Sequence, residues 1–269
     1  MDLGLNGKWL LLVGGSRGMG FSVAESLAAE GANLAIIARD PDRLTKASEE
    51  LAGRFGVRTE ALSADASHAG SIDAAVATAL ERGCDLAGLA VCSGPMDSYG
   101  ELHTQPDEAF DFYYQNVFMP VVRSARAIAP HLISRGGGTI VTLAAYSTRA
   151  QKPTLPHYTA MKSAVVSVTK NLSKAYGKHG IRVNCVCPGM IETPLMHELI
   201  DPAEAMAKYG GTKEEALYRY TEDVWGMKLS LQRCGRPEEV GELVTFLLSE
   251  RAAYLTGATI NIDGGTDFF

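Results

Sequence analysis

A glycine-rich turn between an apolar strand and an amphipathic helix is the feature that most constrains this chain. The apolar run from Trp9 to Val13 is followed by glycines at positions 14, 15, 18 and 20, and a helical pattern begins near Phe21. Glycines allow a tight turn and a close approach of the backbone, and the unpaired N–H groups at a helix start attract an anion. The turn therefore predicts a phosphate-binding site, with the spacing GxxxGxG counted from Gly14 rather than GxGxxG.

Composition narrows the class of protein. The chain has 269 residues, is 46% hydrophobic and carries a formal net charge of −6, so we expect an ample core and no nucleic-acid partner. No apolar stretch is long enough to span a membrane, and the N-terminus lacks a signal-peptide pattern. The odd count of five cysteines indicates free thiols and a reducing compartment, so we expect a cytoplasmic protein.

Apolar runs alternate with helical patterns almost to the end of the chain. This alternation predicts an α/β fold: one Rossmann-type domain over 1–269, with a doubly wound parallel sheet of about seven strands and helices on both faces. The expected strands are 8–13, 33–38, 58–62, 86–91, 139–143, 182–186 and 259–262. The expected helices lie near 20–30, 41–53, 70–82, 107–134, 158–178 and 237–249.

A long polar and aromatic segment interrupts this alternation near 190–230 and contains Tyr218, Tyr220 and Trp225. It is longer than a typical connection between secondary-structure elements. We expect two short helices there that form a mobile lid over the substrate; a packed or subunit-contacting insertion is the alternative.

Tyr158 and Lys162 are four residues apart, so on a helix they share one face. A nearby cation favours phenolate, and we therefore expect Lys162 to lower the pKa of Tyr158 and to make it a usable acid or base. Such a pair also occurs by chance on many helices, so the pattern needs support from the rest of the chain.

That support comes from several motifs in a fixed order. They are the glycine turn, Asp65, Gly94, Asn116, Tyr158 with Lys162, Pro188-Gly189, Gly235-Arg236-Pro237-Glu238-Glu239-Val240 and Asp263-Gly264-Gly265. Together they resemble the classical short-chain dehydrogenase/reductase (SDR) family over essentially the whole chain.

The resemblance implies roles for individual residues. Tyr158 would pass a proton to or from the substrate oxygen, Lys162 would bind the nicotinamide ribose hydroxyls, and Asn116 would hold a water in a proton relay to Lys162. No metal is implied. The cofactor-binding residues would be Gly14, Ser16, Arg17, Gly18, Met19, Gly20, Arg39, Asp65, Ala66, Ser93, Gly94, Tyr158, Lys162, Pro188, Gly189, Ile191 and Thr193.

The chain departs from the family pattern at the site of chemistry. Ala145 stands where the family usually has its catalytic Ser, thirteen residues before Tyr158. Alanine cannot donate a hydrogen bond to the reacting oxygen. We expect a nearby hydroxyl to replace it, with Ser147 the first choice and Tyr146 the second; the alternative is that Tyr158 acts alone. The chain also reads Val91-Cys92-Ser93-Gly94 where Asn-Asn-Ala-Gly is usual.

The end of the second expected strand predicts the cofactor. NAD enzymes need an acid there for the ribose 2′-hydroxyl, but Ala38 stands at that position and Arg39 follows it. With Arg17 in the glycine turn, two guanidinium groups could bind one phosphate, which favours NADP(H).

The function expected from these observations is an NADP(H)-dependent ketoreductase or alcohol dehydrogenase that acts on a small carbonyl or alcohol substrate. Two alternatives remain: reduction of a conjugated C=C bond, and a dinucleotide-binding sensor or structural subunit with little turnover. We also expect a homotetramer. Its contacts would involve apolar residues of the long helices and of the C-terminus, namely Phe110, Phe112, Val165, Val168, Phe268 and Phe269.

Overall fold

The computed structural model describes residues 2–96 and 99–266. Within these residues one parallel sheet has the strand order β3-β2-β1-β4-β5-β6-β7, which confirms the predicted doubly wound fold. The strand boundaries agree with the expected ones to within one or two residues. They are β1 (Trp9–Val13), β2 (Asn33–Ala38), β3 (Thr59–Ser63), β4 (Leu86–Val91), β5 (Gly138–Leu143), β6 (Ile181–Pro188) and β7 (Thr259–Ile262).

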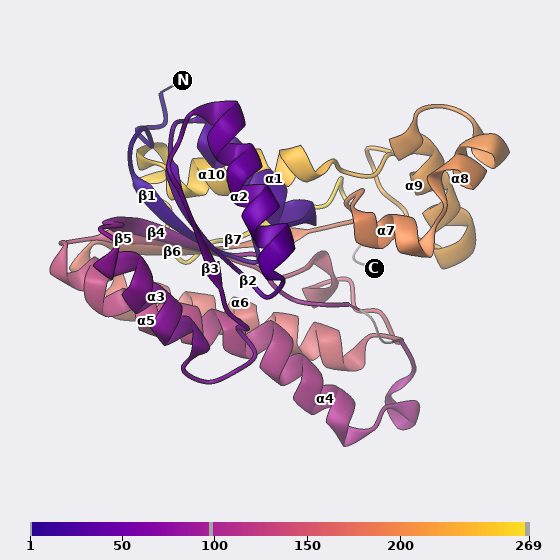
Figure 1. The fold of residues 1–269 in the computed structure, drawn as a ribbon. Helices are drawn as coiled ribbons and strands as arrows, with labels where there is room; N and C mark the ends of the chain where they lie inside the picture. Colours follow the sequence, from indigo (N-terminus) through magenta and orange to yellow (C-terminus); the bar gives the residue numbers. More distant parts are fainter. Residues whose placement is uncertain (1, 97–98, 267–269) are drawn as a thin grey trace.

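Helices cover both faces of this sheet (Figure 1). On the upper face of that view lie α1 (Gly18–Ala29), α2 (Pro41–Phe55) and α10 (Pro237–Leu248). On the lower face lie α3 (Ser71–Glu81), α5 (Met119–Ser134) and α6 (Pro156–Tyr176).

The apolar strands explain why both faces are covered. Leu11 of β1 packs into the core with α3, α5 and α6, whereas its neighbours Leu10 and Leu12 pack into the core with α1 and α10. Successive side chains of a strand point to opposite faces, so a strand that is apolar at every position needs a helix layer on each side.

The strand order reverses between β1 and β4, because the chain runs from β1 to β3 on one side and continues from β4 on the other. In open α/β sheets, ligands bind beyond the carboxyl ends of the strands at such a switch point. The glycine turn after β1 and Gly94 after β4 both lie there.

The segment expected to be one helix over 107–134 is helical throughout, but it is not a regular α-helix along its whole length. The segment begins as α4 (Asp107–Tyr113), continues as a π-helix over Tyr114–Phe118 and then becomes α5. A π-helix adds one residue to a turn and is common at functional sites.

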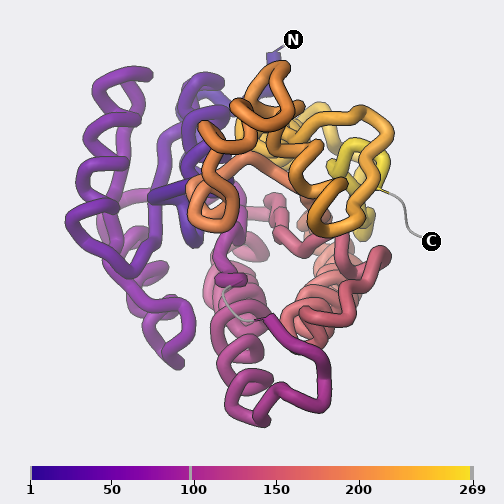
Figure 2. Tube along the Cα trace, turned by 90° about the vertical axis from the view of Figure 1, so that its right-hand side faces the viewer, coloured from indigo at the N-terminus to yellow at the C-terminus, as the bar shows by residue number. Residues whose placement is uncertain are grey.

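The 190–230 insertion contains three helices rather than the two expected: α7 (Pro194–Leu199), α8 (Pro202–Tyr209) and α9 (Lys213–Trp225). It has a small core of its own, which includes Met196, Leu217 and Tyr218. Figure 2 shows these orange helices on the opposite side of the molecule from the magenta segment that contains α4. Because α7 follows the carboxyl end of β6, the insertion lies beyond that end of the sheet (Figure 1).

Candidate active site

The glycine turn packs against the end of β4. Gly14 has φ +90°, and a Cβ there would lie 3.0 Å from the backbone nitrogen of Ser93. A Cβ at Gly20 would lie 1.9 Å from the carbonyl oxygen of Gly14. At Gly18, by contrast, φ is +55° and no atom lies within 4 Å of an added Cβ. Helix α1 begins at this open position, so an anion could approach its first N–H groups; that one binds there stays a prediction.

The two arginines predicted to select the cofactor are both exposed. Arg17 is the N-cap of α1, and Arg39 follows β2 directly. In the described part of the chain, neither guanidinium forms a salt bridge with a carboxylate. Both are therefore available to bind a phosphate. Ser16 and Met19, which belong to the same turn, are half-buried.

The loop after β3 brings Asp65 close to Arg39. Burial alone would raise the pKa of Asp65, but hydrogen bonds from Ser67 and the positive charge of Arg39 hold it below its usual value. The backbone nitrogen of Ser67 donates to Asp65 Oδ1 at 2.9 Å. The carboxylate is thus ionised and held in place by its own turn.

Sequence reasoning missed a buried arginine behind this loop. Arg123 of α5 is 5% exposed. It donates from Nη1 to the carbonyl oxygen of Ala66 at 2.8 Å and from Nη2 to Gln115 Oε1 at 2.6 Å. Arg123 therefore ties the loop after β3 to the π-helix. The available signal was a charged residue within the apolar helical run from Pro120 to Ala125.

Tyr158 and Lys162 lie together on α6, as predicted. Both are buried, and Lys162 Nζ is 5.6 Å from the centroid of the Tyr158 ring. Burial raises the pKa of Tyr158 above its usual range, and the phenols of Tyr146 and Tyr113 add to this shift. The expectation that Lys162 lowers the pKa of Tyr158 is therefore wrong here, because desolvation of the phenolate dominates.

Lys162 instead donates a hydrogen bond to the backbone at the end of β5. Its Nζ donates to the carbonyl oxygen of Leu143 at 2.9 Å, and burial lowers its pKa to about 8. A Cβ at Gly94, where φ is +144°, would lie 3.2 Å from the same Nζ. The glycine after β4 therefore leaves room for the ammonium group at the switch point.

Asn116 forms a hydrogen bond within its own helical segment. Its Nδ2 donates to the carbonyl oxygen of Phe112 at 2.9 Å within the helix. The buried side chain of Val117 packs with Tyr158, and its Cγ2 would lie 3.6 Å from a Cβ at Gly94. The role of Asn116 in a water relay stays a prediction.

The turn that contains Ala145 packs against Tyr158. Ala145 is buried and belongs to the same apolar cluster as Tyr158, Val117 and Leu155. Ser147, the first choice for a replacement hydroxyl, is 2% exposed and accepts a hydrogen bond from Thr159 Oγ1 at 3.3 Å.

Two rings lie beside Tyr158. Tyr113 packs edge-on against Tyr158 at a centroid distance of 6.0 Å and stacks on His157 at 4.3 Å. His157 Nδ1 accepts a hydrogen bond from the backbone nitrogen of Tyr158 at 2.8 Å. These contacts fix the start of α6 and with it the position of the phenol.

The predicted segment after β6 lies at the carboxyl end of the sheet. Pro188 ends β6, and a Cβ at Gly189 would lie 2.6 Å from Asp263 Cα, so the Pro188-Gly189 and Asp263 segments touch. Ile191 pairs with Gly235 in an isolated bridge, and Thr193 caps α7 by accepting from the backbone nitrogen of Met196 at 3.4 Å.

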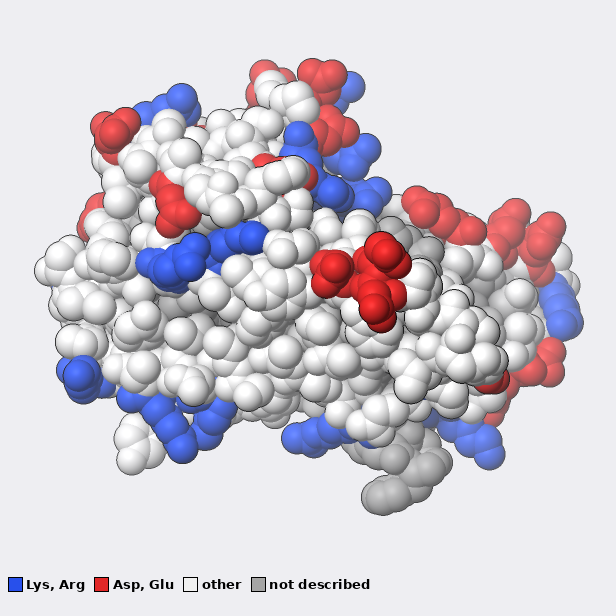
Figure 3. Space-filling view, turned by 90° about the horizontal axis from the view of Figure 1, so that it is seen from below, with Lys and Arg blue, Asp and Glu red and all other residues white. Residues whose placement is uncertain are grey.

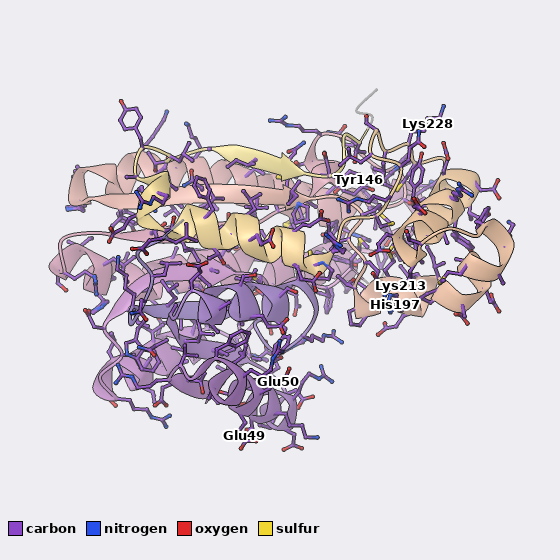
Figure 4. The ribbon with its side chains drawn as sticks, turned by 90° about the horizontal axis from the view of Figure 1, so that it is seen from above. Glu49, Glu50, Tyr146, His197, Lys213 and Lys228 are labelled. Carbon is purple, nitrogen blue, oxygen red and sulfur yellow. The ribbon has the colours of Figure 1, made fainter. Side chains whose placement is uncertain are left out.

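Ion pairs fix both ends of the 190–230 insertion. Glu192 Oε1 lies 2.9 Å from His197 Nε2 and 2.7 Å from Lys213 Nζ, which joins α7 to α9. Figure 4 shows His197 and Lys213 close together on the insertion. At the other end Arg233 pairs with both carboxylate oxygens of Glu239, at 2.6 and 2.9 Å. The hydrogen bonds from Arg233 lower the pKa of Glu239 to about 2.

Comparison with known proteins decides the family. The family model described as enoyl-(acyl carrier protein) reductase matches residues 13–267. Oxidoreductase UcpA from Salmonella typhimurium is 34% identical over 263 residues, which cover 97% of this chain and 95% of UcpA. The chain belongs to the short-chain dehydrogenase/reductase family.

Solved structures of SDR proteins agree with this assignment. L-sorbose reductase from Gluconobacter frateurii, complexed with NADPH and L-sorbose, is 32% identical with a TM-score of 0.88 and 98% coverage of both chains. The NADPH-bound structure of a short-chain oxidoreductase from Pseudomonas aeruginosa PAO1, described as containing an atypical catalytic center, is 26% identical with a TM-score of 0.86 and 96% coverage of both chains. The chain is thus an oxidoreductase of the SDR type.

Three further observations complete the description. All five cysteines are free thiols, as predicted. No group of three or more His, Cys, Asp or Glu side chains within 2–96 and 99–266 is placed to hold a metal ion. None of the helices in those ranges combines the length and the apolar character needed to cross a membrane.

Proposed function

We propose that this SDR protein is an NADP(H)-dependent oxidoreductase that interconverts a carbonyl group and a secondary alcohol, with Tyr158 as the acid and base. The observation that carries the proposal is the position of Tyr158 and Lys162. Both lie on α6 beside Gly94, at the switch point of the sheet where the glycine turn also ends. The proposed proton donor and the proposed anion site therefore lie at the same edge of the sheet.

The raised pKa of Tyr158 fits the reduction direction. The phenol stays protonated at neutral pH, so it can give its proton to an oxygen that gains negative charge. Lys162 would hold the ribose hydroxyls of the cofactor through its ammonium group, while the carbonyl of Leu143 orients that group. In the oxidation direction Tyr158 would take the proton back.

The residues of the chain fit NADP(H). The open first turn of α1 at Gly18 suits a pyrophosphate, and the exposed Arg17 and Arg39 suit a 2′-phosphate. Arg39 also faces Asp65, whose loop would flank the adenine. The cofactor, when bound, supplies or accepts the hydride. L-sorbose reductase, which was solved with NADPH, supports this assignment.

A second candidate is reduction of a conjugated C=C bond. It is favoured by the description of the matching family model as an enoyl reductase and by Ala145 at the position of the usual Ser. The experiment that separates the candidates is steady-state NADPH oxidation with a panel of aldehydes, ketones, ketoses and enones. We expect turnover of carbonyl compounds. Turnover of enones alone would favour the second candidate, and NADPH binding without any turnover would indicate a sensor.

The proposal of a homotetramer is supported by exposed apolar and uncharged surface. Phe112 is 41% exposed, and the face seen in Figure 3 has a broad uncharged area between its charged clusters. A groove of about 520 Å³ runs between α6 and β7. Val165, however, is buried in the core of its own subunit and cannot take part, which corrects that expectation. Phe268 and Phe269 lie outside the described residues.

A further inference from the structure

Three hydroxyl side chains follow Ala145 in a short 3-10 helix, η3 (Tyr146–Thr148), and the structure already uses two of them. Ser147 is buried and is bonded to Thr159 of α6. Thr148 Oγ1 donates to the carbonyl oxygen of Ala145 at 3.0 Å. Thr148 cannot donate to a substrate without giving up the bond that holds the turn, and Ser147 is 2% exposed.

Tyr146 differs from both neighbours. Its hydroxyl donates to Met227 Sδ at 3.5 Å, and a thioether sulfur is a weak acceptor. A carbonyl or alkoxide oxygen would therefore replace Met227 as the acceptor at little cost. Burial raises the pKa of Tyr146 to about 12, so the phenol keeps its hydrogen at neutral pH.

The position of Tyr146 is suited to the reacting oxygen. Ala145, which directly precedes it, packs in the cluster of Tyr158. After burial, the phenol of Tyr146 is the strongest influence that raises the pKa of Tyr158. Figure 4 shows Tyr146 at the end of the sheet beside the 190–230 insertion.

We propose that Tyr146 is a second hydrogen-bond donor to the substrate oxygen and replaces the hydroxyl that Ala145 lacks. This proposal rests on the proposed function and changes the order of the two candidates expected from the sequence. Tyr146 transfers no proton. It keeps its hydrogen and exchanges Met227 for the oxygen as that atom gains negative charge, while the proton of the product hydroxyl comes from Tyr158.

The test compares substitutions under single-turnover and steady-state conditions, with NADPH and the carbonyl compound that the wild type reduces fastest. Tyr146→Phe keeps the ring and should lower kcat by about 100-fold, because a donor to a developing oxyanion acts mainly in the transition state. The Kd of NADPH, measured by fluorescence, should stay within about twofold. Adding Ala145→Ser to Tyr146→Phe should recover at least about tenfold in kcat, because it restores the usual donor.

Two further substitutions make the result specific. Tyr176→Phe removes a phenol hydroxyl at the far end of α6 and controls for the general effect of the change. Ser147→Ala tests the competing donor. A Tyr146→Phe enzyme within about threefold of wild type, or a loss of about 100-fold on Ser147→Ala alone, would overturn the proposal while leaving the proposed function intact. Absence of turnover in the wild type with every panel compound would overturn both.

Discussion

Lys162 should make the stability of this protein depend on pH in a predictable direction. Its side chain is buried, and burial lowers its pKa from 10.5 to about 8. The unfolded chain keeps the lysine proton up to its ordinary pKa, so between about 8 and 10.5 the unfolded state binds more protons than the folded state. The free energy of unfolding therefore rises with pH across this window.

The size of the effect follows from the same two pKa values. Keeping the ammonium group buried below about pH 8 costs about 3 kcal/mol relative to high pH. Between pH 7 and 9.5 the free energy of unfolding of the wild type should rise by about 2 kcal/mol relative to that of Lys162→Met. The difference between the two proteins isolates Lys162, because most other titrating groups are common to both.

Urea denaturation at a series of pH values measures this difference. Lys174→Met, which removes an exposed lysine from the same helix, is the matched control. The reasoning would be refuted if the stability difference between wild type and Lys162→Met stayed constant over the range, or if the wild type became relatively less stable as pH rises.

Three other predictions follow. Arg123→Met should lower the free energy of unfolding by about 2 kcal/mol, because it leaves a buried carbonyl without its donor, whereas the exposed Arg126→Met should not; urea denaturation tests both. Replacing Arg17 and Arg39 by Ala should reduce the preference for NADPH over NADH by at least about tenfold in kcat/KM, and an unchanged preference would contradict their role. If residues 190–230 form a mobile lid, NADPH and substrate together should slow limited proteolysis there; equal cleavage in all states would count against it.

Most of the sheet could be predicted because strands such as β1, β2 and β4 are apolar at nearly every position. A run such as Leu86–Val91 is too short for a typical helix, and its β-strand was expected with the correct bounds. The glycine turn was equally informative, because the positive φ values at Gly14 and Gly18 and the close backbone approach at Gly14 leave few other residues acceptable.

The side chains around Tyr158 were harder to predict. Which of them face Tyr158 depends on the rotational phase of the helical segment over 107–134. The π-helix at Tyr114–Phe118 adds a residue, and one residue turns the following side chains by about 100°. The pattern alone could not show that Val117 packs against Tyr158. Ala66, which accepts a hydrogen bond from Arg123, is likewise distant in sequence.

In the proposed mechanism Tyr158 transfers the proton, and a substitution that removes only its hydroxyl tests this role. Tyr158→Phe keeps the ring in its apolar cluster and removes the transferable proton. With NADPH prebound and the best carbonyl substrate of the panel, the single-turnover rate should fall by about 10²–10⁴-fold, while the Kd of NADPH changes little. A Tyr158→Phe protein that retained more than about half of the wild-type rate would contradict the mechanism.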